Sequence, residues 1–596
     1  MNNFRKNHEL LFVLLVAMAL SFVVFGNSLA GGFVFDDTAV VKNRGDLKDP
    51  SFFLNLFVSP YHQNIPKTGL YRPLTMASYA INHFLGGSAK SFHLVNIIIH
   101  ALNSFLVFWL VWRFLKSKSM AYISFLLFLV HPLHTEAVTS IVGRAELLAF
   151  LWSMMTIYFF FKNYKLLAGL SFLLALWSKE TALALLPVLF YLDLYFEQTN
   201  FWPAVKRLSF LALPLGVYSV FRYLALGKYF TGDVTTTIVE NQLKFVSFLE
   251  RIFTALKVLA MYAERLIWPI HLSADYAYQR ISLISNIFKS PEALLGLFLL
   301  GMLVWLAVRF RKTSIHGGAL GLGAIFFLFP YLMISNLIRP VGTIMGERLM
   351  YLPSLGFVII LAFLLSKLNH KLFYVILAVL LVFFGARTII RNKDWKDNQT
   401  LFAATVKESP NSLITRTALA GVHIRANEWK EAKQELEIAN NIYTDNSHLQ
   451  NLLGIVADHE GHPELAEARF NRAIQLNPDA IDAYINLAEL YFKYKQLESA
   501  AANFLKVIEF YPVPEYLLRY AYAEVAINHP EEAIRVLQKY AGGSLKHPDF
   551  SAAIGTAYFV KGDYKQALTY LKNARELGNK APELGQMIQI AEKKLK

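Results

Sequence analysis

The sequence predicts an all-α protein in which a membrane bundle of about eleven spans is followed by a C-terminal helical solenoid. The 596 residues are 55% hydrophobic with a mean hydropathy of +0.38, which is too apolar for a soluble protein of this size. Apolar runs long enough to cross a bilayer recur through the first two thirds of the chain. The last third instead carries amphipathic segments at a regular spacing. We therefore expect a membrane domain at 1–404 and a repeat domain at 405–596.

The spans follow from apolar runs that are separated by polar or basic turns. The first run has a basic start, and no small-residue cleavage site follows it, so we expect an uncleaved anchor helix. The runs lie at 10–26, 92–115, 120–137, 144–162, 165–177, 181–196, 208–226, 292–310, 318–335, 350–366 and 371–387. Two long segments, 27–91 and 227–291, contain amphipathic stretches at 52–58 and 243–268 that we expect to lie along the membrane surface.

Basic residues predict the orientation of these spans, because Lys and Arg concentrate in cytoplasmic turns. Residues 1–408 hold 37 Lys and Arg against 20 Asp and Glu, whereas residues 409–596 hold 21 against 23. The net charge of +15 thus belongs to the membrane part, and we expect lipid and phosphate contacts but no nucleic-acid partner. The turns expected in the cytoplasm carry Arg113, Lys116, Lys118, Lys162, Lys165, Lys206, Arg207, Arg309, Arg311, Lys312, Lys367 and Lys371. The N-terminus should then be cytoplasmic and everything from 388 onward extracytoplasmic, although Arg387, Arg391 and Lys393 depart from the rule.

With this orientation, the charged clusters that border the apolar runs fall on one face of the membrane. These clusters are Asp36-Asp37, His131 to Glu136 with Arg144, Lys179-Glu180, and Gly346-Glu347-Arg348. Two adjacent carboxylates near lipid repel each other and lose hydration, so a cation, a substrate or a catalytic need must offset the cost. Convergence on one face favours an extracytoplasmic active site over a set of solvated loops.

The C-terminal third carries an internal repeat. Alanines fall at 432, 466, 500, 533 and 567, spaced by 34, 34, 33 and 34 residues. This is the tetratricopeptide-repeat (TPR) pattern, in which small residues let paired helices pack closely and stack into a superhelix. Five repeats fit, at about 411–444, 445–478, 479–512, 513–546 and 547–580. Such arrays bind extended peptides in their groove, and a purely structural array stays the alternative.

The chemistry of the clustered residues suits an anionic, lipid-linked substrate. Arginine makes bidentate contacts with phosphate and lysine supplies a point charge, so Arg72, Arg144, Lys179 and Arg348 are candidates to hold one. A carboxylate such as Asp36 or Asp37 can deprotonate an acceptor hydroxyl while the phosphate leaves. His131, His134 and Glu136 have the composition of a metal site, but Pro132 disturbs a helical spacing of the two histidines. We therefore assign no metal or other cofactor, and a divalent ion stays an alternative.

A series of motifs resembles one family. They are FVFDD at 33–37, YRPLT at 71–75, FHLVN at 92–96 with a later His100, HPLHTEAV at 131–138 followed by GRAELL at 143–148, KE at 179–180, ADY at 274–276, GERLMYLPSLGF at 346–357 and DW at 394–395. In this order they resemble the transmembrane and tetratricopeptide-repeat-containing protein O-mannosyltransferases, within the C-type superfamily of multi-spanning glycosyltransferases. The resemblance covers nearly all of residues 27–410, with the repeat array following.

The resemblance implies a polyprenyl-phosphate-sugar donor, an inverting transfer and a catalytic acidic pair in the first external loop. Asp36 and Asp37 would be that pair, and the site would be lined by His131, His134, Glu136, Arg144, Lys179, Glu347 and Arg348. The repeat array is shorter than in many members of the family, which leaves the acceptor open. The lack of cysteines and the compact form favour a bacterial inner membrane over an endoplasmic reticulum.

The leading hypothesis is a membrane glycosyltransferase that moves a mannose-like hexose from a polyprenyl phosphate to a protein hydroxyl. A second hypothesis is a non-catalytic, membrane-anchored TPR scaffold, which would not need the acidic pair. A third, a transporter or lipid flippase, would call for polar residues at the bilayer midplane and internal symmetry among the spans, and the sequence shows neither.

Overall fold

The computed structural model describes residues 2–62, 66–232, 236–310, 315–541 and 547–596. Every regular element in these described ranges is helical, as the sequence predicts. The chain divides into two compact units, residues 1–415 and 416–596. The helices of the first unit are α1 (Asn2–Phe25), α2 (Pro73–Phe84), α3 (Ala89–Leu115), α4 (Lys118–Val130), α5 (Thr135–Thr139), α6 (Arg144–Phe161), α7 (Lys165–Ser178), α8 (Leu185–Tyr195), α9 (Phe201–Leu208), α10 (Ala212–Leu226), α11 (Phe248–Ile267), α12 (Pro291–Arg309), α13 (Ile315–Ile334), α14 (Ser354–Leu365), α15 (His370–Asp394) and α16 (Asn398–Glu408).

Each expected span coincides with helical structure, but the helices differ in length. By length and composition, six described helical stretches can cross a membrane, or seven if α4 and the segment after it count as one span bent by 50°. The six are His8–Ala30, Ala89–Leu115, Ile141–Phe161, Phe201–Tyr229, Pro291–Arg309 and His370–Asp394. Shorter apolar helices lie at Lys165–Ser178, Gly318–Ile334 and Ser354–Leu365. The bundle of apolar helices is confirmed, and the number of crossings stays a prediction.

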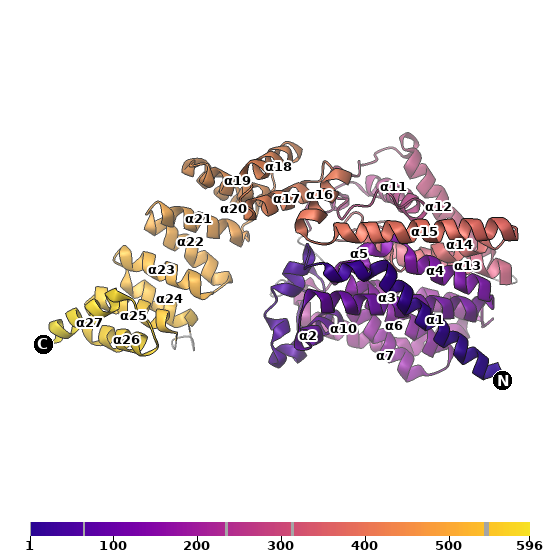
Figure 1. Cartoon of the computed structure of the whole chain (residues 1–596), viewed down its shortest axis with the longest axis horizontal. Coiled ribbons are helices and arrows are strands. Elements are labelled where there is room, and N and C mark those ends of the chain that lie inside the picture. Colours follow the sequence, from indigo (N-terminus) through magenta and orange to yellow (C-terminus); the bar gives the residue numbers. More distant parts are fainter. Residues whose placement is uncertain (1, 63–65, 233–235, 311–314, 542–546) are drawn as a thin grey trace. The chain divides into compact units, whose positions relative to one another are not determined.

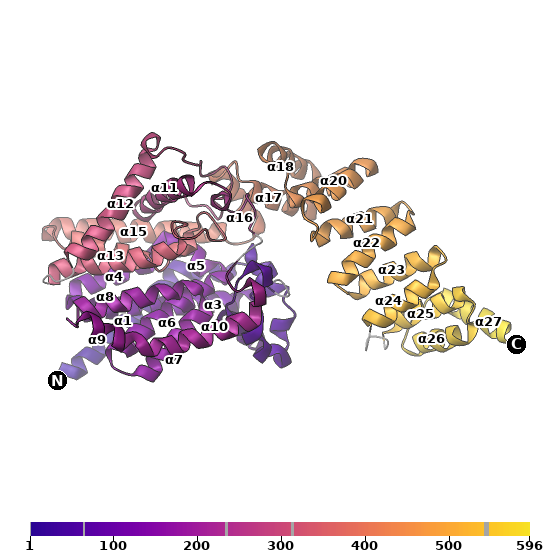
Figure 2. The same cartoon turned by 180° about the vertical axis from the view of Figure 1, so that it is seen from behind.

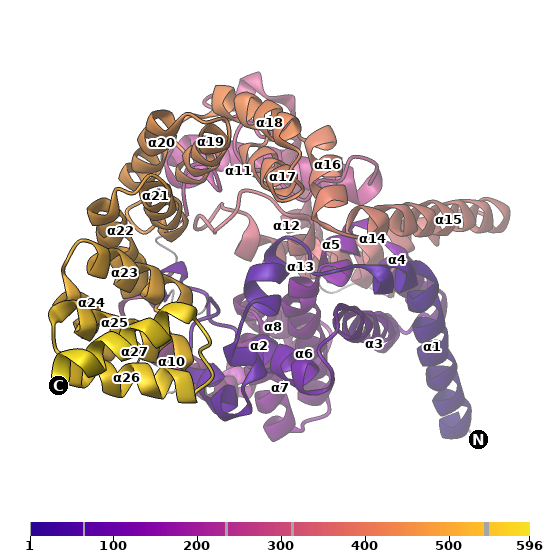
Figure 3. The same cartoon turned by 60° about the vertical axis from the view of Figure 1, so that its left-hand side comes forward.

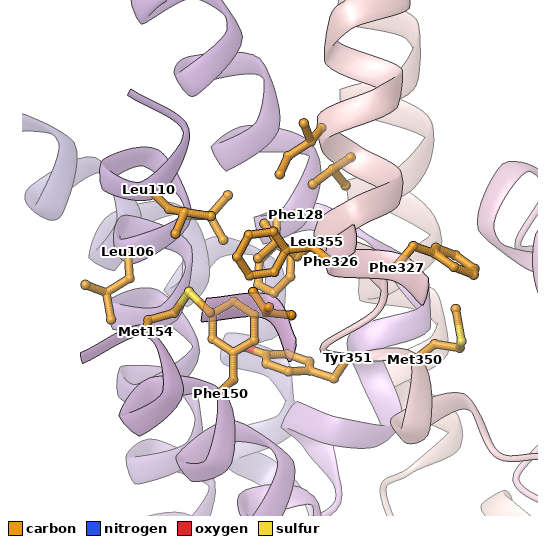
Figure 4. Packing of buried hydrophobic residues seen from close by; sticks show 14 of the residues in the cluster. Leu106, Leu110, Phe128, Phe150, Met154, Phe326, Phe327, Met350, Tyr351 and Leu355 are labelled. Carbon is orange, nitrogen blue, oxygen red and sulfur yellow. The ribbon is translucent and has the colours of Figure 1, made fainter. Parts of the chain in front are cut away.

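One apolar core holds this unit together, and α3 packs within it against α1, α4 and α6 (Figures 1 and 2). Near its middle the rings of Phe128, Phe150 and Tyr351 pack on one another, with centroids 5.2 to 5.4 Å apart (Figure 4). Offset and edge-on aromatic pairs of this kind stabilise a core beyond the apolar area that they bury. Because Tyr351 lies three residues after Arg348, this packing places the GERLMYLPSLGF motif at 346–357 against α4 and α6.

The bend after α4 has a local cause. His131 is extended (φ −67°, ψ 125°) because the proline that follows it disfavours helical geometry. The chain then becomes helical again in α5 and makes a tight turn at Gly143. A Cβ atom there would lie 2.2 Å from the carbonyl oxygen of Ala137. Only glycine fits this close approach, which brings α5 and the start of α6 together.

The second unit is a stack of helix pairs (Figure 3). Starting with the helix that crosses the division, its elements are α17 (Leu413–Arg425), α18 (Trp429–Ile442), α19 (Ser447–His459), α20 (Pro463–Leu476), α21 (Ile481–Lys493), α22 (Leu497–Phe510), α23 (Pro514–Ala526), α24 (Pro530–Ala541), α25 (Pro548–Lys561), α26 (Tyr564–Glu576) and α27 (Pro582–Leu595). The five alanines that mark the repeat are all fully buried. At Gly454 a Cβ atom would lie 2.5 Å from the ring of Phe470, so glycine permits the close packing of α19 on α20. The predicted TPR architecture is confirmed.

Candidate active site

The two adjacent aspartates after α1 point in different directions. Asp37 is fully buried and accepts hydrogen bonds from the N–H groups of Val34 (3.2 Å) and Val142 (2.8 Å) and from the Ser140 hydroxyl (3.3 Å). Burial raises the pKa of this carboxyl to about 7. Asp37 therefore ties the loop to the turn before α6. Asp36 instead has a side chain that is 40% exposed.

Arg348 lies between two carboxylates. Its Nη1 is 3.1 Å from Oε1 of Glu136 and 3.5 Å from Oδ2 of Asp36, and its backbone N–H donates to Glu136 Oε2 at 2.9 Å. The Glu136 side chain is buried, whereas that of Arg348 is 30% exposed. Burial opposes the positive charge, but Glu136 and Asp36 hold the pKa of Arg348 above its ordinary value. Asp36 and Arg348 thus form an open, partly exposed ion pair, and the buried Glu136 holds Arg348 in place.

Glu347, the preceding residue, faces inward. Its Oε1 accepts hydrogen bonds from the backbone N–H of Ser273 (2.6 Å) and the hydroxyl of Tyr276 (2.8 Å), and its Oε2 lies 3.7 Å from Nη2 of Arg391. Burial raises the pKa of Glu347 to about 7. Arg391 is itself buried near the end of α15 and also binds Asp394 at 3.0 Å. Glu347 therefore links the site to the loop after α11 and to α15.

A second charged cluster lies at the end of α7. Arg72 makes a two-pronged contact with Glu180, at 2.8 and 3.2 Å, and its guanidinium lies 5.1 Å from the ring centroid of Tyr61. Lys179 pairs with Glu146 in a buried salt bridge. Burial raises the pKa of Tyr61 to about 12, and the charges of Arg72, Asp36 and Arg348 all act on that hydroxyl. Tyr61 thus contacts the second cluster through Arg72 and lies within the electrostatic influence of Asp36 and Arg348.

Arg144 does not join either cluster. Its guanidinium is fully buried and donates to Asn96 (2.8 Å), Asn82 (2.7 Å) and the Phe92 carbonyl (2.9 Å), and it stacks 4.9 Å from the ring centroid of Tyr79. These contacts hold α2, α3 and the start of α6 together. Arg144 thus supports the loop that carries Val142, the partner of Asp37, from within the protein.

The two histidines of the HPLHTE motif also face the interior. His131 accepts from the Leu133 N–H at Nδ1 (3.2 Å), so its Nε2 carries the proton that is donated to the Leu266 carbonyl (3.0 Å). His134 Nε2 contacts the Ser354 hydroxyl at 2.8 Å. With Glu136 bound to Arg348, the three candidate metal ligands take separate partners. Among the described residues, no group of three or more His, Asp or Glu is placed to hold a metal ion, and this arrangement does not fit one.

The site collects helix ends that are far apart in the sequence. Its charged side chains come from the loop after α1, the first turn of α5, the start of α6, the end of α7, the 3-10 turn Glu347–Met350 before α14 and the end of α15. Of the side chains at the site, Tyr61, Glu146 and Arg391 are not predicted from the sequence, and Glu180 is predicted only as part of the Lys179-Glu180 cluster. Glu146 and Glu180 stand inside the GRAELL and KE motifs, and Arg391 departs from the rule for basic residues, so each carried a signal. Nothing in the sequence marks Tyr61.

The bundle, its charged site and the repeat stack together define a multi-spanning membrane protein that carries a tetratricopeptide-repeat array. The family model described as tetratricopeptide repeat matches residues 459–518. Over 91% of its length the chain is 25% identical to the protein O-mannosyl-transferase TMTC3 of Mus musculus and to that of Homo sapiens. It is 24% identical to the Tmtc3 protein of Drosophila melanogaster. The resemblance predicted from the motifs is confirmed, since these relatives are named protein O-mannosyl-transferases.

The chain covers only part of these relatives, namely 59% and 60% of the mouse and human proteins and 64% of the fly protein. Among solved structures, the crystal structure of YrrB, described as a TPR protein with an unusual peptide-binding site, is 17% identical with a TM-score of 0.29. That match covers 32% of this chain and 97% of YrrB.

Proposed function

We propose that the protein is a membrane glycosyltransferase that transfers a mannose-like hexose from a polyprenyl phosphate to a protein hydroxyl on the extracytoplasmic face. The observation that carries this proposal is the open pair of Asp36 and Arg348, which is braced by the buried Glu136. A base beside a fixed guanidinium is what transfer from a sugar phosphate to a hydroxyl requires. The names of the relatives support the same reaction class.

In the proposed reaction, Asp36 takes the proton of the acceptor hydroxyl while that oxygen attacks the anomeric carbon. The bond between this carbon and the phosphate oxygen breaks, and its electron pair leaves with the phosphate. Arg348 and Arg72 would stabilise the growing negative charge, since guanidinium groups contact phosphate oxygens in pairs. A single displacement of this kind inverts the configuration at the anomeric carbon. Asp37, Glu136 and Glu347 hold the reacting groups in place.

The repeat array would select the polypeptide acceptor. Stacked helix pairs form an extended groove that suits an unfolded chain, and the basic turns of the membrane part support an extracytoplasmic placement of the array. A bacterial inner membrane is the location that the composition favours. The alternative, a non-catalytic scaffold, is favoured only by the array itself.

The two functions differ in their need for Asp36. Extracytoplasmic proteins from cells that lack the chain are compared by mass spectrometry after the chain or its Asp36→Asn variant is restored. If the protein is a glycosyltransferase, hexose-bearing peptides should return with the natural chain alone. Equal return with both would contradict the mechanism, and no return with either would leave the scaffold as the better account.

A further inference from the structure

The segment just before the repeat array contacts the site at both of its ends. We call residues 396–412 the clasp; it comprises α16 and the residues on either side of it. The helix begins with a capping box, in which Asp397 accepts from the Thr400 N–H at 2.8 Å and the Thr400 hydroxyl lies 3.2 Å from the Asp397 N–H. A helix start is well fixed when the side chains of its first residues bond each other's backbone N–H groups in this reciprocal way. The clasp can therefore serve as a firm attachment point.

At its beginning the clasp holds the loop of Asp36. The side-chain oxygen of Asn398 accepts a hydrogen bond from the backbone N–H of Phe35 at 2.7 Å. The ring of Phe402 packs edge-on against that of Phe35, with centroids 5.7 Å apart. The Gly32 N–H donates to the Lys396 carbonyl at 2.9 Å, so this stretch of the loop is bound at two points along its backbone.

Phe35 needs such support because of its backbone conformation. Its φ of 56° lies in the left-handed region, which costs free energy for a residue with a Cβ atom and persists only where its surroundings enforce it. Phe35 directly precedes Asp36, so its φ and ψ determine where the carboxylate points. The bond from Asn398 is thus placed to fix the direction of Asp36.

At its end the clasp holds the loop that binds Glu347. The Ser412 hydroxyl donates to Asp275 Oδ2 at 2.5 Å, and the Ser409 hydroxyl lies 2.9 Å from that of Ser273 and 3.1 Å from the Asp275 carbonyl. The backbone N–H of Ser273 is in turn a hydrogen-bond donor to Glu347. The same short segment therefore supports two sides of the site.

We propose that the clasp positions the reacting groups, with Asn398 as the positioning residue for Asp36. This inference rests on the proposed glycosyl transfer and adds a residue that touches neither substrate nor reacting atoms. It predicts that loss of the Asn398 acceptor lets Phe35 relax and turns Asp36 away, so that the chemical step slows while the donor still binds.

The test uses the full chain in detergent and measures donor binding, transfer rate and melting temperature side by side. Asn398→Leu keeps the size but removes the acceptor, and it should lower kcat by at least about tenfold, as small misplacements of reacting groups do, with an unchanged Kd for the donor. Asn398→Asp keeps an acceptor oxygen and should restore most of the rate. Its added charge beside the loop should also shift the acid limb of the pH–rate profile upward. Gln399→Leu, on the next and exposed residue of α16, is the matched control and should behave as the natural protein.

A double-mutant cycle separates positioning from general damage. Glycine adopts positive φ at no steric cost, so in a Phe35→Gly background the Asn398→Leu change should cost clearly less than it does in the natural chain. Normal transfer by Asn398→Leu would overturn the proposal. So would a parallel loss of rate, donor binding and melting temperature that Asn398→Asp does not rescue. If the natural chain transfers no sugar at all, it is the proposed function that fails.

Discussion

Replacing the two aspartates of the acidic pair one at a time by asparagine should separate rate from stability. Asp36→Asn should lower the transfer rate, whereas Asp37→Asn should lower the stability of the fold. Asp36 is partly exposed, and the 3.1 Å contact between Arg348 and Glu136 does not involve Asp36. An exposed ion pair contributes about 0–1 kcal/mol, so Asp36→Asn should leave the melting temperature almost unchanged. Loss of a general base nevertheless lowers the rate on the order of 10²–10⁴-fold. Donor binding should persist, because the shape of the side chain is kept.

Asp37→Asn should show the reverse pattern. The buried carboxyl of Asp37 accepts three hydrogen bonds, and an amide in its place turns an NH₂ group toward one of the donors. A buried donor left without a partner costs about 1–3 kcal/mol, which should appear as a lower melting temperature in detergent at pH 5. Transfer of hexose to an acceptor peptide, donor binding and thermal unfolding are measured on the same preparations. If Asp36→Asn transfers at the natural rate, Asp36 is not the base and the mechanism is wrong.

Three further predictions follow from the same contacts. Arg348→Ala should weaken donor binding by about 10–100-fold in a binding titration, the worth of a charge-assisted phosphate contact, whereas Arg144→Ala should chiefly lower the melting temperature; equal effects on donor affinity would contradict the assignment. Because the pKa of Asp37 rises to about 7 in the folded state, its carboxyl stabilises the fold fully only below its unfolded pKa near 4, and this contribution falls until about pH 7. The natural chain should therefore lose about 2–3 kcal/mol relative to Asp37→Asn between pH 5 and 7, seen as converging or crossing melting curves, and parallel curves would refute it. Truncation after Thr415 keeps the clasp and should impair transfer to protein more than donor binding. An equal loss of donor binding would instead make the array a structural part of the enzyme.

The periodic parts of the fold were the easiest to predict from the sequence. A spacing of 33 or 34 residues between small residues leaves little choice of architecture, and the buried alanines Ala432 and Ala567 lie where that spacing requires. The apolar runs likewise marked the helices of the bundle, since burial in lipid or core selects the same residues. Composition placed the domain boundary near residue 404, whereas the contacts of α16 and of Ser412 keep residues up to 415 with the first unit.

The contacts within the site were less accessible to sequence reasoning. Arg348 and Glu136 are separated by more than two hundred residues, so a shared face could be predicted but not the bond between them. Arg144 is a clear case of ambiguity. A basic residue at the start of an apolar helix suits a phosphate site, but the amides of Asn82 and Asn96 consume its donors, and neither residue carries a local signal for that contact. From the sequence, charged residues in a membrane protein thus indicate where a site lies more readily than they indicate which role each residue has.

The contacts at the two ends of the bundle also bear on how many helices cross the membrane. Away from the site, Arg113 at the end of α3 pairs with Glu197 beyond α8, and Arg207 of α9 pairs with Asp193 of α8. Because Glu180 stands just before α8 and Asp193 near its end, this helix of eleven residues runs from the active-site cluster to the opposite set of contacts. It does so with a 3-10 turn, Glu180–Ala184, added in front of it, which rises about 2 Å per residue against 1.5 Å for an α-helix. Short helices such as α7, α8 and α14 fail a length criterion because the site interrupts them, and this supports the higher number of crossings that the alternation of basic turns predicts.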